Sequence, residues 1–230
     1  MKTIRCHQIN DDISTISLDE VDIAPPGAGE VQIRVMACSV NFPDVLMIQG
    51  KYQFAPPLPF APGGEFAGEI VAVGPDVDQF KVGDRAVAGT RYGGFSELVN
   101  AEVQAVKPVP PGISFEKAAA YQTAYLTAYV ALTIRGSLKA GETLLVHGAT
   151  GGVGLAAVDL GKHLGATVIA TGGTDEKLAV VKARGADHVI NYTLPDDSLG
   201  GFREKVKGLT DGLGADVVFD PVGGSVFDES

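Results

Sequence analysis

Short segments with a strand-like alternation of polar and apolar residues occupy the first part of the chain, up to about residue 115. A period of two is typical of half-buried strands, and glycine-containing turns separate these segments. The predicted strands are 32–36, 69–73, 85–88 and 95–99. Prolines gather at 56–62 and 108–111, and proline at this density does not fit central strands. The pattern therefore predicts a small, irregular β-barrel.

Strands and helices alternate in the second part of the chain. Ser114 is a predicted helix N-cap, with Lys117 where a full capping box has Glu, and a helical apolar run follows at 118–132. The predicted strands are 143–147, 167–171, 187–191 and 216–220, and the helices between them are 152–164, 175–184 and 198–209. This alternation is typical of βαβ units in a parallel, doubly wound sheet. We therefore predict an α/β chain with one domain at 1–120 and a second at 121–230.

A glycine-rich turn links the first strand and helix of the second part. It matches G-x-G-x-x-G with alanine in the first place, over Ala149, Thr150, Gly151, Gly152, Val153 and Gly154. Gly151 would let backbone approach a pyrophosphate, and Gly154 would let the helix pack close to the sheet. The free N–H groups at the helix start would then hold the negative charge. The turn predicts dinucleotide binding, and the alternative is a purely structural glycine turn.

The end of the second predicted strand bears on which dinucleotide binds. NAD sites usually place Asp or Glu there to hold the ribose 2′-hydroxyl, whereas residues 170–173 read ATGG. An acid would repel a 2′-phosphate, so its absence favours NADP. Lys177 lies one helical turn further on and could reach that phosphate, or it is a solvated helix lysine.

Charge and cysteine content exclude several classes of protein. Lys and Arg number 18 against 28 Asp and Glu, a net charge of −10, which argues against a nucleic-acid partner. Two cysteines are too few for a disulfide framework or a cysteine-rich zinc lobe. No apolar run reaches the roughly 18 residues of a membrane span, and the N-terminus lacks a secretory signal. We expect a cytoplasmic protein without a membrane partner.

Motifs along the whole chain resemble the zinc-free quinone oxidoreductase branch of the medium-chain dehydrogenase/reductase superfamily. Besides the glycine turn they are NFPD at 41–44, PGGEFAG at 62–68, VGDRAV at 82–87 and GADHVINY at 185–192. The resemblance implies a GroES-like β-barrel as the substrate domain at 1–120 and a Rossmann NADP-binding domain at 121–230. Four strands are predicted there, where the complete fold has about six. We therefore expect a C-terminally truncated member of the family.

The resemblance also implies roles for matched positions. Zinc-dependent relatives carry Cys and His where this chain has Asn41 and Gly64, and a second Cys near Thr123, so the resemblance implies no zinc. Asn41 and Thr127 would approach the nicotinamide, and residues 151–154 would hold the pyrophosphate. Ala149 and Thr150 would also belong to the cofactor site. Gly173, Thr174, Lys177 and Tyr192 would surround the 2′-phosphate. The implied catalytic residues are Tyr52, Asn41 and Asp44; Tyr52 is a candidate proton or hydrogen-bond donor, or else a packing residue.

These observations predict NADPH-dependent reduction of a quinone or an α,β-unsaturated carbonyl by hydride transfer without zinc. Two alternatives stay open: an NADP-binding protein without turnover, and an enoyl-thioester reductase of the same superfamily. The partner is then a small-molecule substrate. The resemblance implies a homodimer for the full-length family form and leaves the state of a truncated chain open.

Overall fold

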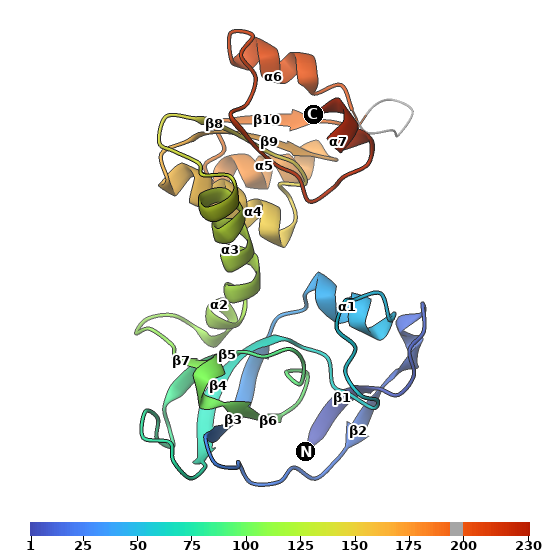
Figure 1. Ribbon diagram of the computed structural model, residues 1–230, viewed down its shortest axis with the longest axis vertical. Coiled ribbons are helices and arrows are strands. Elements are labelled where there is room, and N and C mark those ends of the chain that lie inside the picture. The colour runs from blue at the N-terminus through green and yellow to red at the C-terminus, as the bar shows by residue number, and fades with distance from the viewer. Residues whose placement is uncertain (194–199) are drawn as a thin grey trace. The chain divides into compact units, whose positions relative to one another are not determined.

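The computed structural model describes residues 1–193 and 200–230 (Figure 1). The chain separates into two compact units, Met1–Thr123 and Ala124–Ser230. The domain limits predicted from the sequence, 1–120 and 121–230, stay a prediction. Each unit has its own hydrophobic core and is described by itself.

An antiparallel sheet forms the body of the first unit. Its strands, in the order β6-β3-β4-β5-β7, are β3 (Glu30–Cys38), β4 (Glu65–Val73), β5 (Arg85–Gly89), β6 (Leu98–Glu102) and β7 (Val106–Pro108). Alternate side chains such as Val31, Ile33 and Ile70 are buried in its core, as the period of two predicts. A separate hairpin pairs β1 (Lys2–Cys6) with β2 (Ile16–Glu20). The predicted β-rich architecture of this part is confirmed.

Two predicted strands have different limits in the structure. β4 begins at Glu65 rather than at 69, because β3 approaches Gly68 so closely that an added Cβ would lie 1.9 Å from the Arg34 carbonyl oxygen. Gly68 therefore allows two strands to approach closely and does not mark a turn. β6 begins at Leu98 rather than at 95, because the backbone N–H of Phe95 donates to Pro62 and not to the sheet.

Helices in this unit are short. The structure has 3-10 turns at η1 (Ile13–Thr15) and η2 (Val103–Ala105), and helices α1 (Phe42–Ile48) and α2 (Phe115–Ala119). Ser114 caps α2 by accepting from the Lys117 N–H at 3.3 Å, as predicted.

The prediction of one continuous helix over 118–132 is wrong. α2 stops, α3 (Gln122–Tyr129) starts anew, and a π-helical segment, η3 (Val130–Arg135), follows. The break arises because the N–H groups of Gln122 and Thr123 donate to the side chain of Glu65 and not to the preceding helical turn.

A parallel sheet forms the second unit. Its strands lie in the order β10-β9-β8-β11 and are β8 (Thr143–Val146), β9 (Thr167–Gly172), β10 (His188–Asn191) and β11 (Val217–Phe219). The helices are α4 (Gly152–His163), α5 (Asp175–Ala183), α6 (Arg203–Leu209) and α7 (Ser225–Glu229). The doubly wound order predicted from the alternation is confirmed. The predicted helix 198–209 appears as α6, and its first two residues lie outside the described part of the chain.

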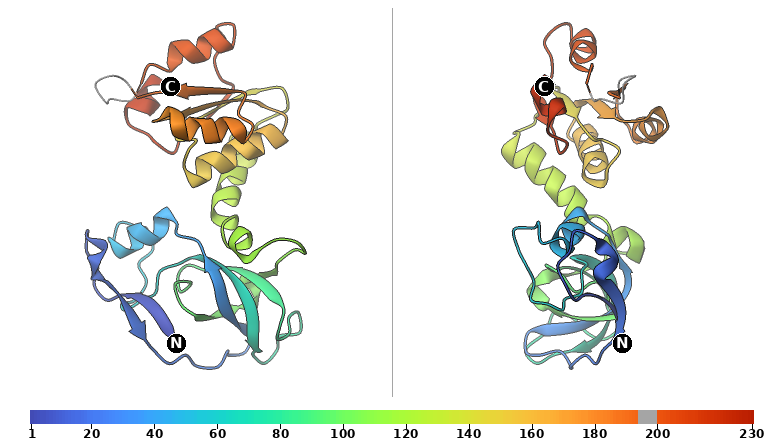
Figure 2. Two further views of the ribbon diagram at one scale, coloured as in Figure 1. Left: turned by 180° about the vertical axis from the view of Figure 1, so that it is seen from behind. Right: turned by 90° about the vertical axis from the view of Figure 1, so that its right-hand side faces the viewer.

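Helices cover both faces of this sheet. Leu144 and Val146 of β8 face the cluster that includes α4 and α5, whereas Leu145 faces the cluster of α6 and α7. Figure 2 shows α6 on the opposite side of the sheet from α4 and α5. Burial on both faces explains why the strands read as nearly continuous apolar runs. Within the described ranges, no helix is long and apolar enough to cross a membrane.

Candidate functional site

The glycine-rich turn lies between the end of β8 and the start of α4. Gly151 occupies the N-cap position of α4, and no side chain caps the helix there. An added Cβ on Gly154 would lie 2.3 Å from the Gly148 carbonyl oxygen, whereas one on Gly152 would meet nothing within 4 Å. Gly154 is therefore required for close packing of the helix on the turn, as predicted. Gly151 and Gly152 are exposed.

This turn has the properties of an anion-binding site. The first N–H groups of a helix lack partners within it, and the helix dipole favours negative charge at the same end. At Gly151 and Gly152 no side chain covers these groups, so a ligand can approach the backbone closely. Ala149 is buried and donates its N–H to the Thr171 carbonyl, while Thr150 and Val153 are half-buried beside it.

Three of the residues predicted to surround a 2′-phosphate meet where β9 leads into α5. Gly173 follows the strand, Thr174 caps α5 by accepting from the Lys177 N–H at 3.4 Å, and the Lys177 side chain is exposed. An added Cβ on Gly172 would lie 2.9 Å from the Thr150 methyl group, so this junction adjoins the glycine turn. The predicted residues of the two segments therefore share one end of the sheet.

Tyr192 lies just beyond β10. Its backbone N–H donates to the Gly172 carbonyl at 3.2 Å, which sets it beside the end of β9. The ring is only 7% exposed and packs in the cluster of Ile190 and Phe202. Burial raises the pKa of the Tyr192 hydroxyl, and the negative charge of Asp220 adds to that effect. Thr127 is exposed on α3.

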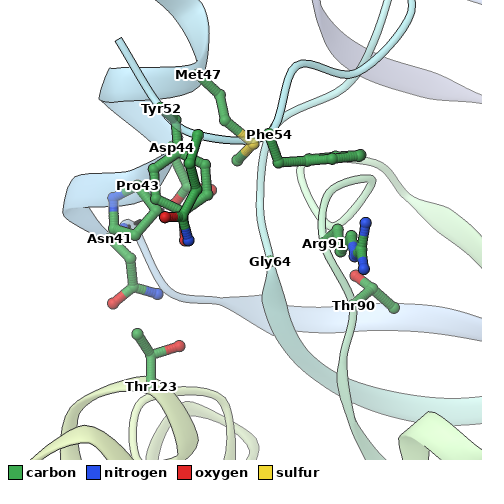
Figure 3. A pocket seen from close by; sticks show the side chains of 11 residues that line it. Asn41, Pro43, Asp44, Met47, Tyr52, Phe54, Gly64, Thr90, Arg91 and Thr123 are labelled. Carbon is green, nitrogen blue, oxygen red and sulfur yellow. Dashed lines mark hydrogen bonds between the residues drawn. The ribbon is translucent and has the colours of Figure 1, made fainter.

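The three predicted catalytic residues line one pocket in the first unit (Figure 3). Its volume is about 480 Å³. The lining residues are Asn41, Pro43, Asp44, Met47, Tyr52, Gln53, Phe54, Gly64, Thr90, Arg91 and Thr123. Apolar side chains and aromatic rings form much of the wall, and amide and hydroxyl groups are interspersed among them, as in many small-molecule sites.

Asp44 holds the backbone at one side of this pocket. Its carboxylate accepts the N–H of Asn41 at 2.8 Å and the N–H of Gly63 at 3.0 Å, and its side chain is buried. Asn41 is the N-cap of α1. Asp44 therefore ties the start of α1 to the segment before β4, and its lone pairs are engaged by these donors.

A chain of hydrogen bonds orients the Asn41 side chain. Its amide nitrogen donates to the Ser39 hydroxyl at 2.8 Å, and that hydroxyl donates to Glu65 at 3.1 Å. The carboxylate of Glu65 is 1% exposed and also accepts the N–H groups of Gln122, at 2.5 Å, and Thr123, at 3.2 Å. Glu65 thus connects the pocket to the start of α3, a role that no local sequence pattern indicates.

The positions at which zinc-dependent relatives were inferred to carry ligands converge in this pocket. Asn41, Gly64 and Thr123 all line it. Asn41 carries an amide and Thr123 a hydroxyl, whereas Gly64 has no side chain. Structural and catalytic zinc sites use thiolate, imidazole and carboxylate ligands, so these three positions do not fit zinc. In the part of the chain that the structure describes, no three His, Cys, Asp or Glu side chains group as a metal site would require.

Cys38 lies near the pocket residues without lining the pocket. Its thiol donates to the Glu65 carbonyl at 3.1 Å. Burial raises the pKa of the Cys38 thiol to about 12, and the carboxylates of Asp44 and Glu65 contribute to that rise. A thiol in this state is a poor nucleophile.

Tyr52 and Arg91 face the pocket from different loops. Tyr52 packs against the cluster of Cys6, Met47 and Phe60. The described residues give its hydroxyl no hydrogen-bond partner, so that group is available to a bound molecule. Arg91 belongs to the loop between β5 and β6 and was not among the residues predicted for the site. No local pattern marks a loop residue as part of a pocket assembled from distant segments.

Two family models match the chain, one in each part. The model described as "Alcohol dehydrogenase GroES-like domain" matches residues 27–111, and the one described as "Zinc-binding dehydrogenase" matches residues 152–230. The first match confirms the GroES-like character predicted for the N-terminal part.

Curated relatives and solved structures are similar over nearly the whole chain. "Quinone oxidoreductase-like protein 2" of Mus musculus is 38% identical over 216 residues, which are 94% of this chain and 60% of the relative. This chain therefore spans less than two thirds of that relative. Escherichia coli quinone oxidoreductase complexed with NADPH superposes with a TM-score of 0.89 at 34% identity, covering all of this chain and 69% of that one. The enoyl reductase CurK gives a TM-score of 0.87 at 30% identity, covering all of this chain and 70% of that one. The chain therefore belongs to the medium-chain dehydrogenase/reductase family, with relatives and solved neighbours named as quinone oxidoreductases.

Proposed function

We propose that this chain binds NADPH and serves the reduction of a quinone or an α,β-unsaturated carbonyl compound. The observation that carries the proposal is the uncovered glycine turn at the start of α4, which adjoins a strand end without a carboxylate. Escherichia coli quinone oxidoreductase, a structural neighbour, has been solved with NADPH. The predicted oxidoreductase activity belongs to the same proposal.

The residues of the second unit fit the cofactor's phosphates. The exposed backbone at Gly151 and Gly152 would hold the pyrophosphate, with Val153 and Gly154 continuing the helix behind it. Lys177 would pair with the 2′-phosphate near Gly173 and Thr174, where an acidic side chain would repel it. Thr127 and Asn41 stay predicted contacts of the nicotinamide end, and Tyr192 a predicted neighbour of the adenosine phosphate.

When bound, NADPH supplies a hydride from C4 of its nicotinamide ring. The pocket of the first unit would hold the acceptor and exclude water from it through Pro43, Met47 and Phe54. Asn41 presents a side chain fixed by Ser39, and Tyr52 presents a free hydroxyl. The proton that completes the reduction comes from Tyr52 or from solvent. The residues at positions 41, 64 and 123 do not suit zinc, and the proposal includes no step that uses it.

Reduction of an enoyl thioester is a second candidate reaction. The similarity to the enoyl reductase CurK favours it, with a TM-score of 0.87 over the whole of this chain. It uses the same cofactor and the same addition of hydride to an electron-poor double bond. The two candidate reactions therefore differ in the acceptor and not in the cofactor or in the hydride transfer.

A steady-state screen tests the proposed function. The purified protein would be offered NADPH or NADH with a panel of quinones, enones and enoyl thioesters, and oxidation would be followed at the nicotinamide absorbance. We expect turnover with NADPH and weaker turnover with NADH. Binding of NADPH without oxidation by any acceptor would instead favour the alternative of a nucleotide-binding protein without turnover.

Location and assembly remain predictions. We propose a cytoplasmic protein acting on a small molecule, with a homodimer for the full-length family form. Two free cysteines, Cys6 and Cys38, agree with a reducing compartment. Analytical ultracentrifugation of the full-length form would measure its state of assembly, and a monomer of that form would contradict the proposed dimer.

A further inference from the structure

Arg91 is held over an aromatic ring at the pocket of the first unit. Its guanidinium carbon lies 4.7 Å from the centroid of the Phe54 ring, within the range of a cation–π contact. The Phe54 ring in turn stacks on Tyr92, with centroids 6.1 Å apart and planes inclined by 23°. Figure 3 shows Arg91 beside Phe54 and Thr90, across the pocket from Asn41. The guanidinium thus has a defined place in the wall.

The loop that carries Arg91 is fastened on both sides. The Thr90 N–H donates to the Gly64 carbonyl at 2.8 Å, and the Thr90 hydroxyl donates to the Tyr92 carbonyl at 3.0 Å. The Gly93 N–H donates to the Ala61 carbonyl at 2.8 Å. These bonds fix the backbone before and after Arg91, so the loop itself needs little ordering when a ligand binds.

The charge of Arg91 is not neutralised by protein. In the described ranges, no carboxylate forms an ion pair with it. The pocket is also lined by Asp44, but the carboxylate of Asp44 is buried and accepts the N–H groups of Asn41 and Gly63. A guanidinium stacked by its face keeps the N–H groups of its edge free for an anion.

We propose that the pocket selects acceptors that carry an anionic group, and that Arg91 is the residue that binds this group. The inference rests on the proposed function, because it names the class of quinone or enone that the pocket takes. The shared chemistry is a carboxylate, sulfonate or phosphate attached to the acceptor. The chain as a whole has a net charge of −10 and repels anions, so a single unpaired guanidinium facing the pocket discriminates strongly.

A matched pair of acceptors and a matched pair of variants test this inference. The acceptors are 1,4-naphthoquinone and 1,4-naphthoquinone-2-sulfonate, and the variants are Arg91→Met and Arg34→Met. Methionine keeps an unbranched side chain on Phe54 and removes the charge. Arg34 is exposed on β3 and does not line the pocket, so its variant makes the same change in net charge elsewhere in the unit. For each acceptor, kcat/KM is compared between variant and parent, so the intrinsic reactivity of the acceptor drops out of the ratio.

We expect Arg91→Met to lower kcat/KM for the sulfonate by roughly ten- to fiftyfold, the usual effect of losing a charge-assisted hydrogen bond. The value for the neutral quinone should change by less than about threefold. Arg34→Met should change neither by more than that. Arg91→Lys should recover only part of the loss, because an ammonium cannot bind an oxyanion through two parallel bonds. Added salt should raise KM for the sulfonate alone.

Equal losses for both acceptors in Arg91→Met would overturn the inference, since they would mean that Arg91 only packs on Phe54. An unchanged kcat/KM of Arg91→Met for the sulfonate would also overturn it. Calorimetric titration of the sulfonate separates this failure from failure of the proposed function, because binding needs no turnover. Sulfonate binding that depends on Arg91 without any NADPH oxidation would support the anion site and contradict the proposed reaction.

Discussion

Two glycines two residues apart in the same helical turn are expected to respond oppositely to a methyl group. In Gly154→Ala the added Cβ would lie 2.3 Å from the Gly148 carbonyl oxygen and 2.8 Å from the Ala149 Cα, and both are backbone atoms that cannot rotate away. Overpacking of this kind costs about 3 kcal/mol, and the better helix propensity of alanine returns about 1 kcal/mol. The net loss in the free energy of unfolding is therefore about 2 kcal/mol.

Gly152→Ala is the matched control. An added Cβ at Gly152 meets nothing within 4 Å, so the free energy of unfolding should stay within about 1 kcal/mol of the parent. Urea unfolding followed by far-ultraviolet circular dichroism measures both variants. If NADPH phosphates approach this backbone as proposed, Gly152→Ala should still weaken NADPH binding at least about tenfold, because its methyl group occupies the space of the ligand.

The reasoning would be refuted by a Gly154→Ala variant as stable as the parent, or by a Gly152→Ala variant that loses as much stability. A stable Gly152→Ala protein with unaltered NADPH affinity would leave the packing argument intact. It would, however, contradict the proposed position of the pyrophosphate.

Four further predictions concern single side chains. Glu65→Ala should lower the free energy of unfolding, measured in urea, by roughly 3–5 kcal/mol, because three donors lose their acceptor. Glu65→Gln should lower it by about half as much. Equal losses in the two variants would contradict the capping role. Cys38 should resist iodoacetamide at neutral pH in the native protein and react once unfolded, because its pKa is raised to about 12; rapid native labelling, read by intact mass, would be inconsistent with this. Burial lowers the pKa of His147 in the folded protein. As the pH drops through about 6.5, the imidazole therefore takes up a proton in the unfolded chain while it stays neutral in the folded one, and the free energy of unfolding should fall. In urea titrations across pH, His147→Gln should lose that part of the pH dependence, and an unchanged profile would count against it. Tyr52→Phe should lower kcat for an enone at least about tenfold while NADPH affinity is retained, and an unaltered kcat would assign the proton to solvent.

The parallel sheet could be predicted because its signals are local. Each strand of the second unit is a short, mostly apolar run with a helix after it along the chain, and the glycine turn follows β8 as predicted. The close approach at Gly154 was also predictable, because a strand-to-helix turn of this length leaves no room for a side chain. Such features depend on residues within a few positions of one another.

Features set by distant residues could not be predicted from the sequence. The continuous apolar run at 118–132 says nothing of Glu65, a residue 57 positions away from Gln122 whose carboxylate starts α3 anew. The helix α1 has only seven residues, too few for a periodic pattern. Arg91 became a pocket residue only through hydrogen bonds between its loop and the segment at Ala61 and Gly64. In each case tertiary contacts decide what local propensity leaves open.

The central claim is transfer of a hydride from NADPH to an electron-poor acceptor, and isotope labelling tests it most directly. Two samples of NADPH, deuterated at one or the other face of nicotinamide C4, would be incubated with the protein and an α,β-unsaturated ketone. The account predicts that one of the two samples delivers its deuterium to the β-carbon of the saturated product, as read by mass spectrometry and NMR. A product without deuterium from either sample would contradict it, and so would NADPH binding without reduction of either the ketone or a quinone.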